Sequence, residues 1–281
     1  MKKSRLKNLN ARIKEDKVTF TVYVILRIFV VLSAVVAVLR GNYENLFYCV
    51  LTLVLFITPF FAEENFGIEL PRTLEIIILL FIFAAEILGE LQCYYLKVPH
   101  WDTMLHTVNG FLCAAIGFSL VDMFNRTERM TFRLSPLYMA IVAFCFSMTI
   151  GVLWEFFEFG GDMIFHTDMQ KDTVISAIYS VDLNPTGKNI AVGIENITEV
   201  YINGEPLGVG GYLDIGLIDT MKDLFVNFIG AVIFSIIGFF YVKGRGQGRF
   251  ARNFIPTVVI GEDAEASGSP EQVCDGSENK D

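Results

Sequence analysis

The sequence predicts an all-α polytopic membrane protein with six transmembrane helices and a small outward insert that contains β-strands. Of its 281 residues, 53% are hydrophobic, and the mean hydropathy is +0.49, well above that of a soluble domain. Six apolar segments of about 20 residues match the thickness of the hydrocarbon core. Lys and Arg are concentrated in alternate connections, as expected for loops on the cytoplasmic side. This composition argues against a soluble enzyme.

The N-terminus predicts an uncleaved first span rather than a signal peptide. Seven Lys and Arg residues fall within residues 1–17, and an apolar run follows over residues 18–39. The apolar region of a signal peptide is only about 7 to 15 residues long, whereas a spanning helix needs about 20. We therefore expect a basic cytoplasmic segment at 1–17, followed by a transmembrane helix that carries Arg27.

The membrane domain is expected to cover residues 18–243, with both termini in the cytoplasm. Its other five spans are predicted at residues 44–61, 72–92, 101–124, 137–159 and 218–242. One set of connections collects 15 Lys and Arg residues, and the opposite set collects four. Because cytoplasmic loops are the basic ones, this asymmetry predicts that the connection at about 160–217 lies outside the cell.

The outer connection is too polar to span and too long for a plain turn, so we expect a small folded insert. Ile190–Ile194 and Val200–Leu207 have strand-like patterns, and Asn203-Gly204 is a hairpin turn signal within the second. Asp168–Ser180 is predicted as a short amphipathic helix along the membrane interface. The insert is thus expected to form a β-containing cap.

Residues 244–281 are predicted to form a cytoplasmic, acidic and largely disordered tail. Its last part, Glu262–Asp281, holds seven acids and one lysine. This stretch supplies most of the net charge of −9, so the acidic balance of the chain carries no information about nucleic acid. The lipid bilayer is the expected partner, and no nucleic acid partner is expected.

The most informative feature is a set of ionisable residues inside the apolar segments. In the fourth span, Asp102, His106 and Asn109 share one helix face at about 100° per residue. An ionisable group in hydrocarbon costs about 2.5 to 3.5 kcal/mol on insertion scales, so these groups are expected to face other helices or a wet cavity. Acid stripes recur on the third, fifth and sixth spans: Glu75, Glu86 and Glu90; Glu155, Glu158 and Asp162; Asp219 and Asp223. With the predicted orientation, the stripes meet near the outer surface.

The motifs of these spans resemble those of YjdF-like membrane proteins. Their order is D-x-x-x-H-x-x-x-G in the fourth span, W-E-x-x-E in the fifth and D-x-x-x-D-x-x-x-N-x-x-G at the start of the sixth. The resemblance covers roughly residues 72–243 and is carried by Asp102, His106, Gly110, Glu155, Glu158, Asp162, Asp219, Asp223, Asn227 and Gly230. It implies a multi-pass protein of the cell membrane and no particular reaction.

The VanZ-like group is similar more distantly, through an acid and a histidine in one span and a closing acid pattern. This chain departs from it in two ways. It has one more residue between Asp102 and His106 than the VanZ-like spacing, and it carries a long insert at about 181–212.

The acids and the histidine leave three functions open. In an enzyme, the candidate catalytic residues would act on a lipid-linked envelope ligand, with His106 or a glutamate as general base; they are Asp102, His106, Glu155, Glu158, Asp219 and Asp223. In a cation- or proton-coupled transporter, Glu86 and Glu90 would join them. In a structural or stress-related membrane protein, the same groups would only hold helices together. Acids that continue toward the cytoplasm favour transport, and an outer cluster favours an enzyme or a sensor.

A divalent cation is the candidate cofactor. One imidazole together with several carboxylates suits Zn, Mn or another divalent ion. The candidate ligands are His106, Glu155, Asp162 and Asp223.

Overall fold

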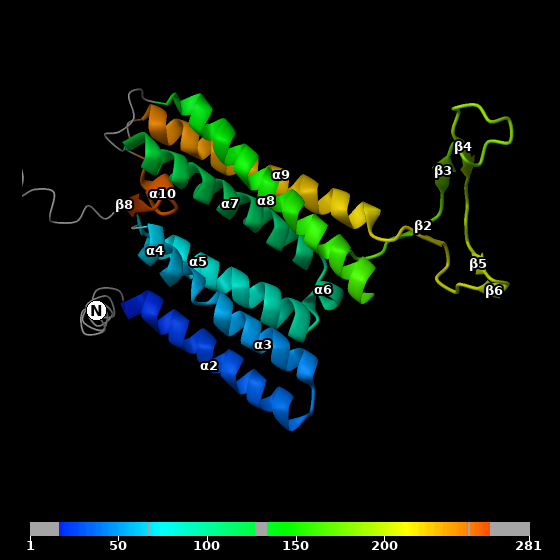
Figure 1. Ribbon diagram of the computed structural model, residues 1–281, viewed down its shortest axis with the longest axis horizontal. Helices are drawn as coiled ribbons and strands as arrows, with labels where there is room; N and C mark the ends of the chain where they lie inside the picture. Colours follow the sequence, from blue (N-terminus) through cyan, green and yellow to red (C-terminus); the bar gives the residue numbers. More distant parts are fainter. Residues whose placement is uncertain (1–16, 67, 127–133, 245, 247, 259–281) are drawn as a thin grey trace, which may run out of the picture.

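The computed structural model describes residues 17–66, 68–126, 134–244, 246 and 248–258. The predicted basic segment at 1–17 lies almost wholly outside the described residues, and the acidic stretch Glu262–Asp281 lies entirely outside them. The described part is mainly helical, with the short strands of the insert extending from one end of a helical body (Figure 1).

The helices fall into two groups that lie side by side (Figure 1). The N-terminal group consists of α2 (Lys17–Leu39), α3 (Tyr43–Leu55), α4 (Thr58–Phe66), α5 (Arg72–Phe83) and the π-helix η1 (Ala84–Leu91). The C-terminal group consists of α7 (Trp101–Arg126), α8 (Pro136–Phe165) and α9 (Leu217–Lys243), each of which contacts the other two. The short helix α6 (Tyr94–Lys97) joins the groups, and α10 (Arg249–Arg252) follows α9.

Within the described residues, five helices are long and apolar enough to cross a membrane, rather than the six expected. They are Lys17–Leu39, Tyr43–Asn65, Trp101–Asn125, Pro136–Phe165 and Leu217–Lys243, close to the predicted first, second, fourth, fifth and sixth spans. The expected third span, 72–92, is α5 followed by η1. Its apolar surface is interrupted by three glutamates, and its geometry changes from α to π at Ala84. The expected count of exactly six spans is therefore not shown, and five candidate spans are.

Local signals explain where two of these helices begin. The side chain of Asn42 accepts a hydrogen bond of 2.9 Å from the backbone N–H of Asn45 at the start of α3. Ser135 does the same for Tyr138 at the start of α8, where Pro136 occupies the first turn. Such residues satisfy N–H groups that the first turn leaves unpaired, and proline has none to satisfy.

Each helix group has its own apolar core. In the N-terminal group, Val30, Cys49, Phe56 and Leu79 are buried together. In the C-terminal group, fully buried aromatic and aliphatic side chains fill the space between α7, α8 and α9, among them Phe118, Met139 and Phe234. The rings of Phe118 and Phe234 meet edge to face with centroids 6.1 Å apart.

The residues after α9 extend this core. Ala251, Phe254 and Ile255 are buried against it, and β8 (Thr257–Val258) pairs antiparallel with β1 (Ile68–Glu69). Residues 249–258, part of the tail predicted to be largely disordered over 244–281, therefore belong to the fold, and residues 259–281 lie outside the described residues.

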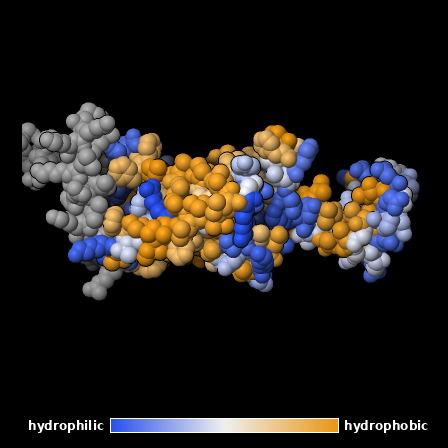
Figure 2. Space-filling model, turned by 90° about the horizontal axis from the view of Figure 1, so that it is seen from below, coloured by the Kyte–Doolittle hydropathy of each residue, from blue (hydrophilic) through white to orange (hydrophobic). Residues whose placement is uncertain are grey.

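The insert between α8 and α9 is built from three two-stranded antiparallel pairs. At its base β2 (Val174–Ile175) pairs with β7 (Tyr212–Leu213); further out β3 (Ile178–Ser180) pairs with β4 (Val192–Ile194), and β5 (Tyr201–Ile202) with β6 (Glu205–Pro206). The predicted strands and the Asn203-Gly204 turn are therefore confirmed. Figure 2 shows a largely hydrophobic surface over the helical body and many hydrophilic residues on the insert.

The helix predicted at Asp168–Ser180 is wrong, since this stretch contains β2 and β3. The reason is that aspartate side chains accept hydrogen bonds from its backbone N–H groups. The N–H groups of residues 169 and 170 donate to Asp162, the N–H of residue 171 donates to Asp219, and the N–H of residue 173 donates to Asp214. Aspartate side chains at the ends of α8 and α9 thus replace the hydrogen bonds that a helix would have made.

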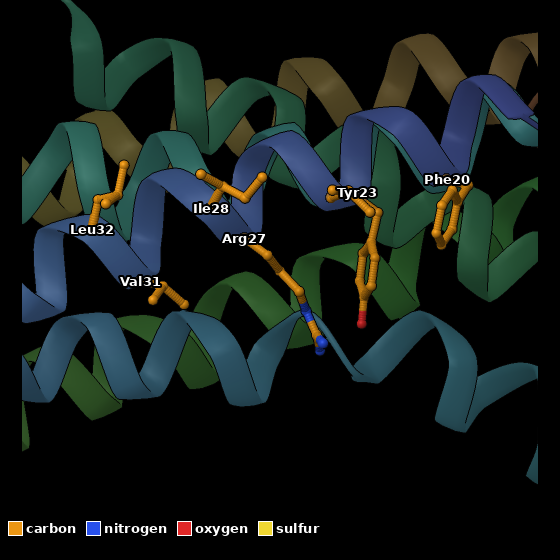
Figure 3. Close-up of a pocket in the computed structure, with 7 residues that line it drawn as sticks. Phe20, Tyr23, Arg27, Ile28, Val31 and Leu32 are labelled. Atoms are coloured by element: carbon orange, nitrogen blue, oxygen red, sulfur yellow. The ribbon is translucent and has the colours of Figure 1, made fainter.

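Arg27 lies in the middle of α2, and its guanidinium is 4.3 Å from the centroid of the Tyr23 ring (Figure 3). The two side chains lie together in a shallow groove of apolar residues that belong to α2 alone. A cation over an aromatic face is stabilised by the ring quadrupole, and Arg27 leans one turn toward the N-terminal end of its helix. Among the described residues, the Nε atom of Arg27 is buried without a hydrogen-bond partner, so the Tyr23 ring is the contact that stabilises this charge.

Candidate functional site

Helices α7 and α9 approach to backbone contact. A Cβ atom on Gly110 would overlap the backbone carbonyl of Asn227, and one on Gly230 would overlap that of Thr107. Small residues permit such approach between membrane helices. The polar faces of α7 and α9 are therefore held against each other.

Four ionisable side chains meet where this bundle faces the insert; we call them the His106 cluster. Its members are Asp102 and His106 of α7, Glu155 of α8 and Asp223 of α9. The Nε2 atom of His106 lies 3.5 Å from Asp102 Oδ1 and 3.8 Å from Asp223 Oδ2, and its Nδ1 atom lies 4.0 Å from Glu155 Oε1. Three members are buried, and Asp102 is partly exposed. Residues distant in sequence are thus brought into one small volume.

The spacing within the cluster suits a bound ion. One donor atom from each of Asp102, His106 and Asp223 lies within 4.8 Å of the other two. The nitrogen–oxygen separations of 3.5 and 3.8 Å exceed an ordinary N–H···O hydrogen bond. They are close to the edge of a tetrahedron, about 3.4 Å when its corners lie about 2.1 Å from a zinc-like ion. The two separations from His106 are therefore compatible with binding of one divalent cation by the three side chains.

The charges of the cluster also call for a positive partner. Asp102 and Asp223 are like charges in close proximity, an arrangement that favours a shared proton or a cation. Glu155 is only 4% exposed, and its Oε2 atom is buried without a hydrogen-bond partner among the described residues. Because an unsatisfied buried acceptor is costly, this oxygen is a natural ligand or proton acceptor.

Asp162, which the sequence analysis groups with the metal ligands, lies outside the cluster. Its Oδ1 atom accepts hydrogen bonds from the Thr167 hydroxyl (2.8 Å) and the Met169 backbone N–H (2.6 Å), and its Oδ2 atom accepts one from the Gln170 backbone N–H (2.9 Å). Both carboxylate oxygens are thus used to fold the start of the insert. We correct its expected role from ligand to loop anchor.

Glu158 and Asp219 lie beside the cluster but have partners of their own. The indole N–H of Trp154 donates a 2.9 Å hydrogen bond to Glu158 Oε1. The backbone N–H of Lys171 donates a 2.8 Å hydrogen bond to Asp219 Oδ2. These two acids border the site, whereas the members of the His106 cluster face one another.

Asp214, just before α9, anchors the return of the insert. It accepts hydrogen bonds from the backbone N–H groups of Thr173, Ile218 and Gly216. Desolvation acts to raise its pKa, but these bonds outweigh that effect and lower the pKa of Asp214 below its ordinary value. The charged carboxylate therefore stabilises the connection between insert and helix.

Two acids of the expected third span are not members of the cluster, although one of them, Glu90, lies close enough to Asp102 for their charges to interact. Glu86 and Glu90 are on η1. Tyr95 lies close enough to Glu86, Glu90 and Asp102 to interact electrostatically with all three carboxylates. The Tyr95 ring packs on Gly89, which leaves no room for a side chain there. The Tyr95 phenol therefore lies near both the η1 acids and Asp102 of the His106 cluster. No sequence motif had indicated this residue.

Two further residues were missed by sequence reasoning. Gln170 of the insert and Thr220 of α9 both reach the Glu155 carboxylate. Gln170 lies in a polar loop with no motif around it, and only the folded chain brings it to the site. Thr220 precedes Asp223 by one turn, so its position on the polar face of α9 was the one available signal.

Beneath the cluster, a layer of uncharged polar groups is followed by an apolar layer. The Asn109 side-chain N–H donates to Asn227 Oδ1 over 3.5 Å, and the Ser147 hydroxyl donates to the Gly110 carbonyl over 2.8 Å. Further along the bundle most buried side chains are apolar, and the polar Ser235 and Asp122 are buried there too; the apolar ones include Ala114, Phe118, Ala143, Ala231 and Phe234. An apolar layer therefore lies between the charged site and Asp122.

The comparisons with known proteins agree with this architecture. The sequence model of a family described as "Predicted membrane protein (DUF2238)" matches residues 21–244. The chain belongs to this family. The DUF2238 region runs from α2 to the end of α9, so it contains the whole His106 cluster and the insert. Its description as a membrane protein fits the five apolar helices.

One relative comes from Thermotoga maritima and is described as "Uncharacterized protein". It is 25% identical over 172 residues, which cover 60% of this chain and 85% of the relative. No solved structure matches the chain. The distant likeness to the VanZ-like group finds no support in these comparisons.

Proposed function

We propose that this DUF2238 protein, YjdF-like in its motifs, binds a divalent cation through the His106 cluster at the outer surface of the cell membrane. Asp102, His106 and Asp223 would each supply one ligand, and Glu155 would act as a fourth ligand or as a base. One observation carries the proposal: three donor atoms lie within 4.8 Å of one another, beyond hydrogen-bond range from His106, beside a buried carboxylate oxygen that lacks a partner.

The outward orientation rests on the distribution of basic residues. Lys and Arg are abundant in the connections opposite the insert and sparse on the insert side. Since cytoplasmic loops retain the positive charges, α5 and η1 would together make a sixth crossing, both termini would be cytoplasmic, and the insert and the His106 cluster would face outward.

The alternatives have less support. A transporter needs a polar path through the bundle, and the fully buried rings of Phe118 and Phe234 fill the space between the helices further along it. A purely structural network would pair its members, whereas Glu155 Oε2 is left without a donor among the described residues. An ion site that opens only toward the insert accounts for both observations.

The ligand class that we propose for this site is a lipid-linked molecule of the cell envelope. Large apolar side chains are exposed on α8 and α9 near the cluster, among them Phe157, Met221 and Phe225. Bilayer lipids therefore reach the flank of the site. A bound ion would polarise an oxygen of the lipid headgroup, and Glu155 would accept a proton.

The test is ion-dependent stability of the purified protein in detergent. Melting temperatures would be compared with Mn²⁺, Zn²⁺, Ca²⁺ and a chelator for the wild type, for His106→Ala and for Asp223→Asn. An ion at 100 times its dissociation constant stabilises the folded state by about 2.7 kcal/mol, so binding is visible as a higher melting temperature. Both variants should lose this response, and a control at the exposed Asp168, Asp168→Asn, should keep it.

The double variant separates a shared site from independent contacts. If His106 and Asp223 bind one ion, the loss of ion response in the double variant should equal that of either single variant. A wild type that responds to no ion and to no chelator contradicts the proposal. Single effects that add in the double variant would contradict a shared site.

A further inference from the structure

We infer that Gln170 is a positioning residue of the cation site: it reaches from the insert to the Glu155 carboxylate and closes the site on the insert side. The inference rests on the proposed cation binding and names a part of the insert that controls it.

Gln170 is a buried side chain in an otherwise polar connection. It lies between the end of α8 and β2, yet only 9% of its surface is exposed. Its backbone N–H donates to Asp162 Oδ2, and its side-chain N–H donates to the Thr220 hydroxyl of α9. Against Gly216 it packs so closely that a Cβ there would lie 2.7 Å from the Cβ of Gln170. Contacts with α8, with α9 and with Gly216 at the start of α9 therefore fix this residue.

The position of Gln170 relative to the cluster gives it a role. Thr220 lies one turn before Asp223 on α9, and the side chains of Gln170 and Thr220 both approach the Glu155 carboxylate. A carboxylate held by neutral donors keeps its orientation without losing its charge. Gln170 therefore sets the direction in which Glu155 presents its unpartnered oxygen.

The segment that carries Gln170 lies across the insert side of the site. Asp162 on α8 holds its first part through two backbone N–H groups, and Asp219 on α9 holds the backbone N–H of Lys171. Residues 167–171 thus cross from one helix to the other above Glu155. An ion that enters from the insert side must pass this segment, which we call the strap. Because hydrogen bonds hold the strap at both ends, it slows exchange of the ion.

The first test measures ion release. The wild type, Gln170→Ala and the control Thr198→Ala would be loaded with whichever of Mn²⁺ or Zn²⁺ stabilises the wild type, and release would be followed after addition of chelator. Gln170→Ala should release the ion at least tenfold faster and bind it more weakly. Thr198→Ala should behave as the wild type, because Thr198 is an exposed residue of the insert outside the segment 167–171. Equal release rates for all three proteins overturn the inference.

The second test needs no ion. A chain with its native cysteines replaced would carry Glu155→Cys, with or without Gln170→Ala, and would be treated with a small charged thiol reagent. The added Gln170→Ala change should speed modification at least tenfold, since the strap no longer covers residue 155. Equal modification rates overturn the inference even if the wild type binds an ion. Faster modification in a protein that binds no ion upholds the closing role of Gln170 and refutes the proposed cation site.

Discussion

Asn227 of α9 holds its backbone carbonyl at the place where a side chain on Gly110 of α7 would begin. The same Asn227 accepts a side-chain hydrogen bond from Asn109, so backbone and side chain both join α9 to α7. This contact lies one turn below His106 and Asp223. The distance between the α7 and α9 members of the His106 cluster therefore depends on a residue with no side chain.

Replacing Gly110 with alanine should separate α7 from α9 and destabilise the protein. Overpacking a tight contact costs roughly 1 to 3 kcal/mol, which should lower the melting temperature in detergent by several degrees. Gly160→Ala is the matched control, because Gly160 is also helical and a Cβ there meets nothing within 4 Å. It should be neutral or slightly stabilising, since alanine favours helix over glycine. Equal losses from both changes would contradict the close contact.

Glu155→Gln should weaken ion binding far more than Glu158→Gln. Glu155 lies in the His106 cluster with one oxygen unpartnered, whereas Glu158 accepts the indole N–H of Trp154. Loss of a charged ligand should raise the dissociation constant at least tenfold, equivalent to about 1.4 kcal/mol. Glu158→Gln should change it less than threefold. Calorimetric titration of the purified proteins measures both, and a reversed order would exclude Glu155 from the site.

Low pH should weaken the hydrogen bonds by which Asp214 holds the helix-proximal end of the insert. The pKa of Asp214 is lowered in the folded protein, so its hydrogen bonds contribute fully above the ordinary aspartate pKa of about 3.9 and are lost as the pH falls through the lowered value. The protection factors of the amides of residues 173, 216 and 218, which are the factors by which they exchange more slowly than in an unstructured peptide at the same pH, should therefore be high at pH 6 and should fall as the pH is lowered through this pKa. Asp214→Asn should show lower protection already at pH 6, whereas Asp182→Asn, at an exposed position of the insert, should not. Protection factors that are independent of both pH and Asp214 would contradict this anchor.

Labelling of intact cells tests the orientation. With a membrane-impermeant thiol reagent, a cysteine at Lys188 of the insert should react, and native Cys274 should react only after the membrane is opened. The reason is the excess of Lys and Arg on the side opposite the insert. Reaction of both cysteines from the same side would refute the predicted topology, and with it the outward position of the His106 cluster.

Composition and periodicity were sufficient for the membrane class and for most of the helices. Five predicted spans have counterparts because runs of apolar residues of bilayer length fold as helices whatever surrounds them. The third predicted span is divided between an α-helix and a π-helix: Glu86 and Glu90 fall where the helix adopts π geometry, and helix geometry depends on packing as well as on the period of the sequence. The stretch Asp168–Ser180 failed because three distant aspartates bind its backbone, which no local pattern reveals.

The sequence by itself determined that Asp102, His106, Glu155 and Asp223 would turn away from lipid, since the cost of an ionisable group in hydrocarbon is a property of each residue alone. Only the tertiary structure decided which acids meet the histidine. Asp162 and Asp219 share helix faces with cluster members, yet they bind the backbone of the insert instead. Helical periodicity predicts which face of one helix a side chain occupies. Which side chains meet depends on how α7, α8 and α9 are placed relative to one another and on which residues of the insert lie against them. That placement was set by Gly110, Gly230 and Gln170, whose contacts are formed only when the chain is folded.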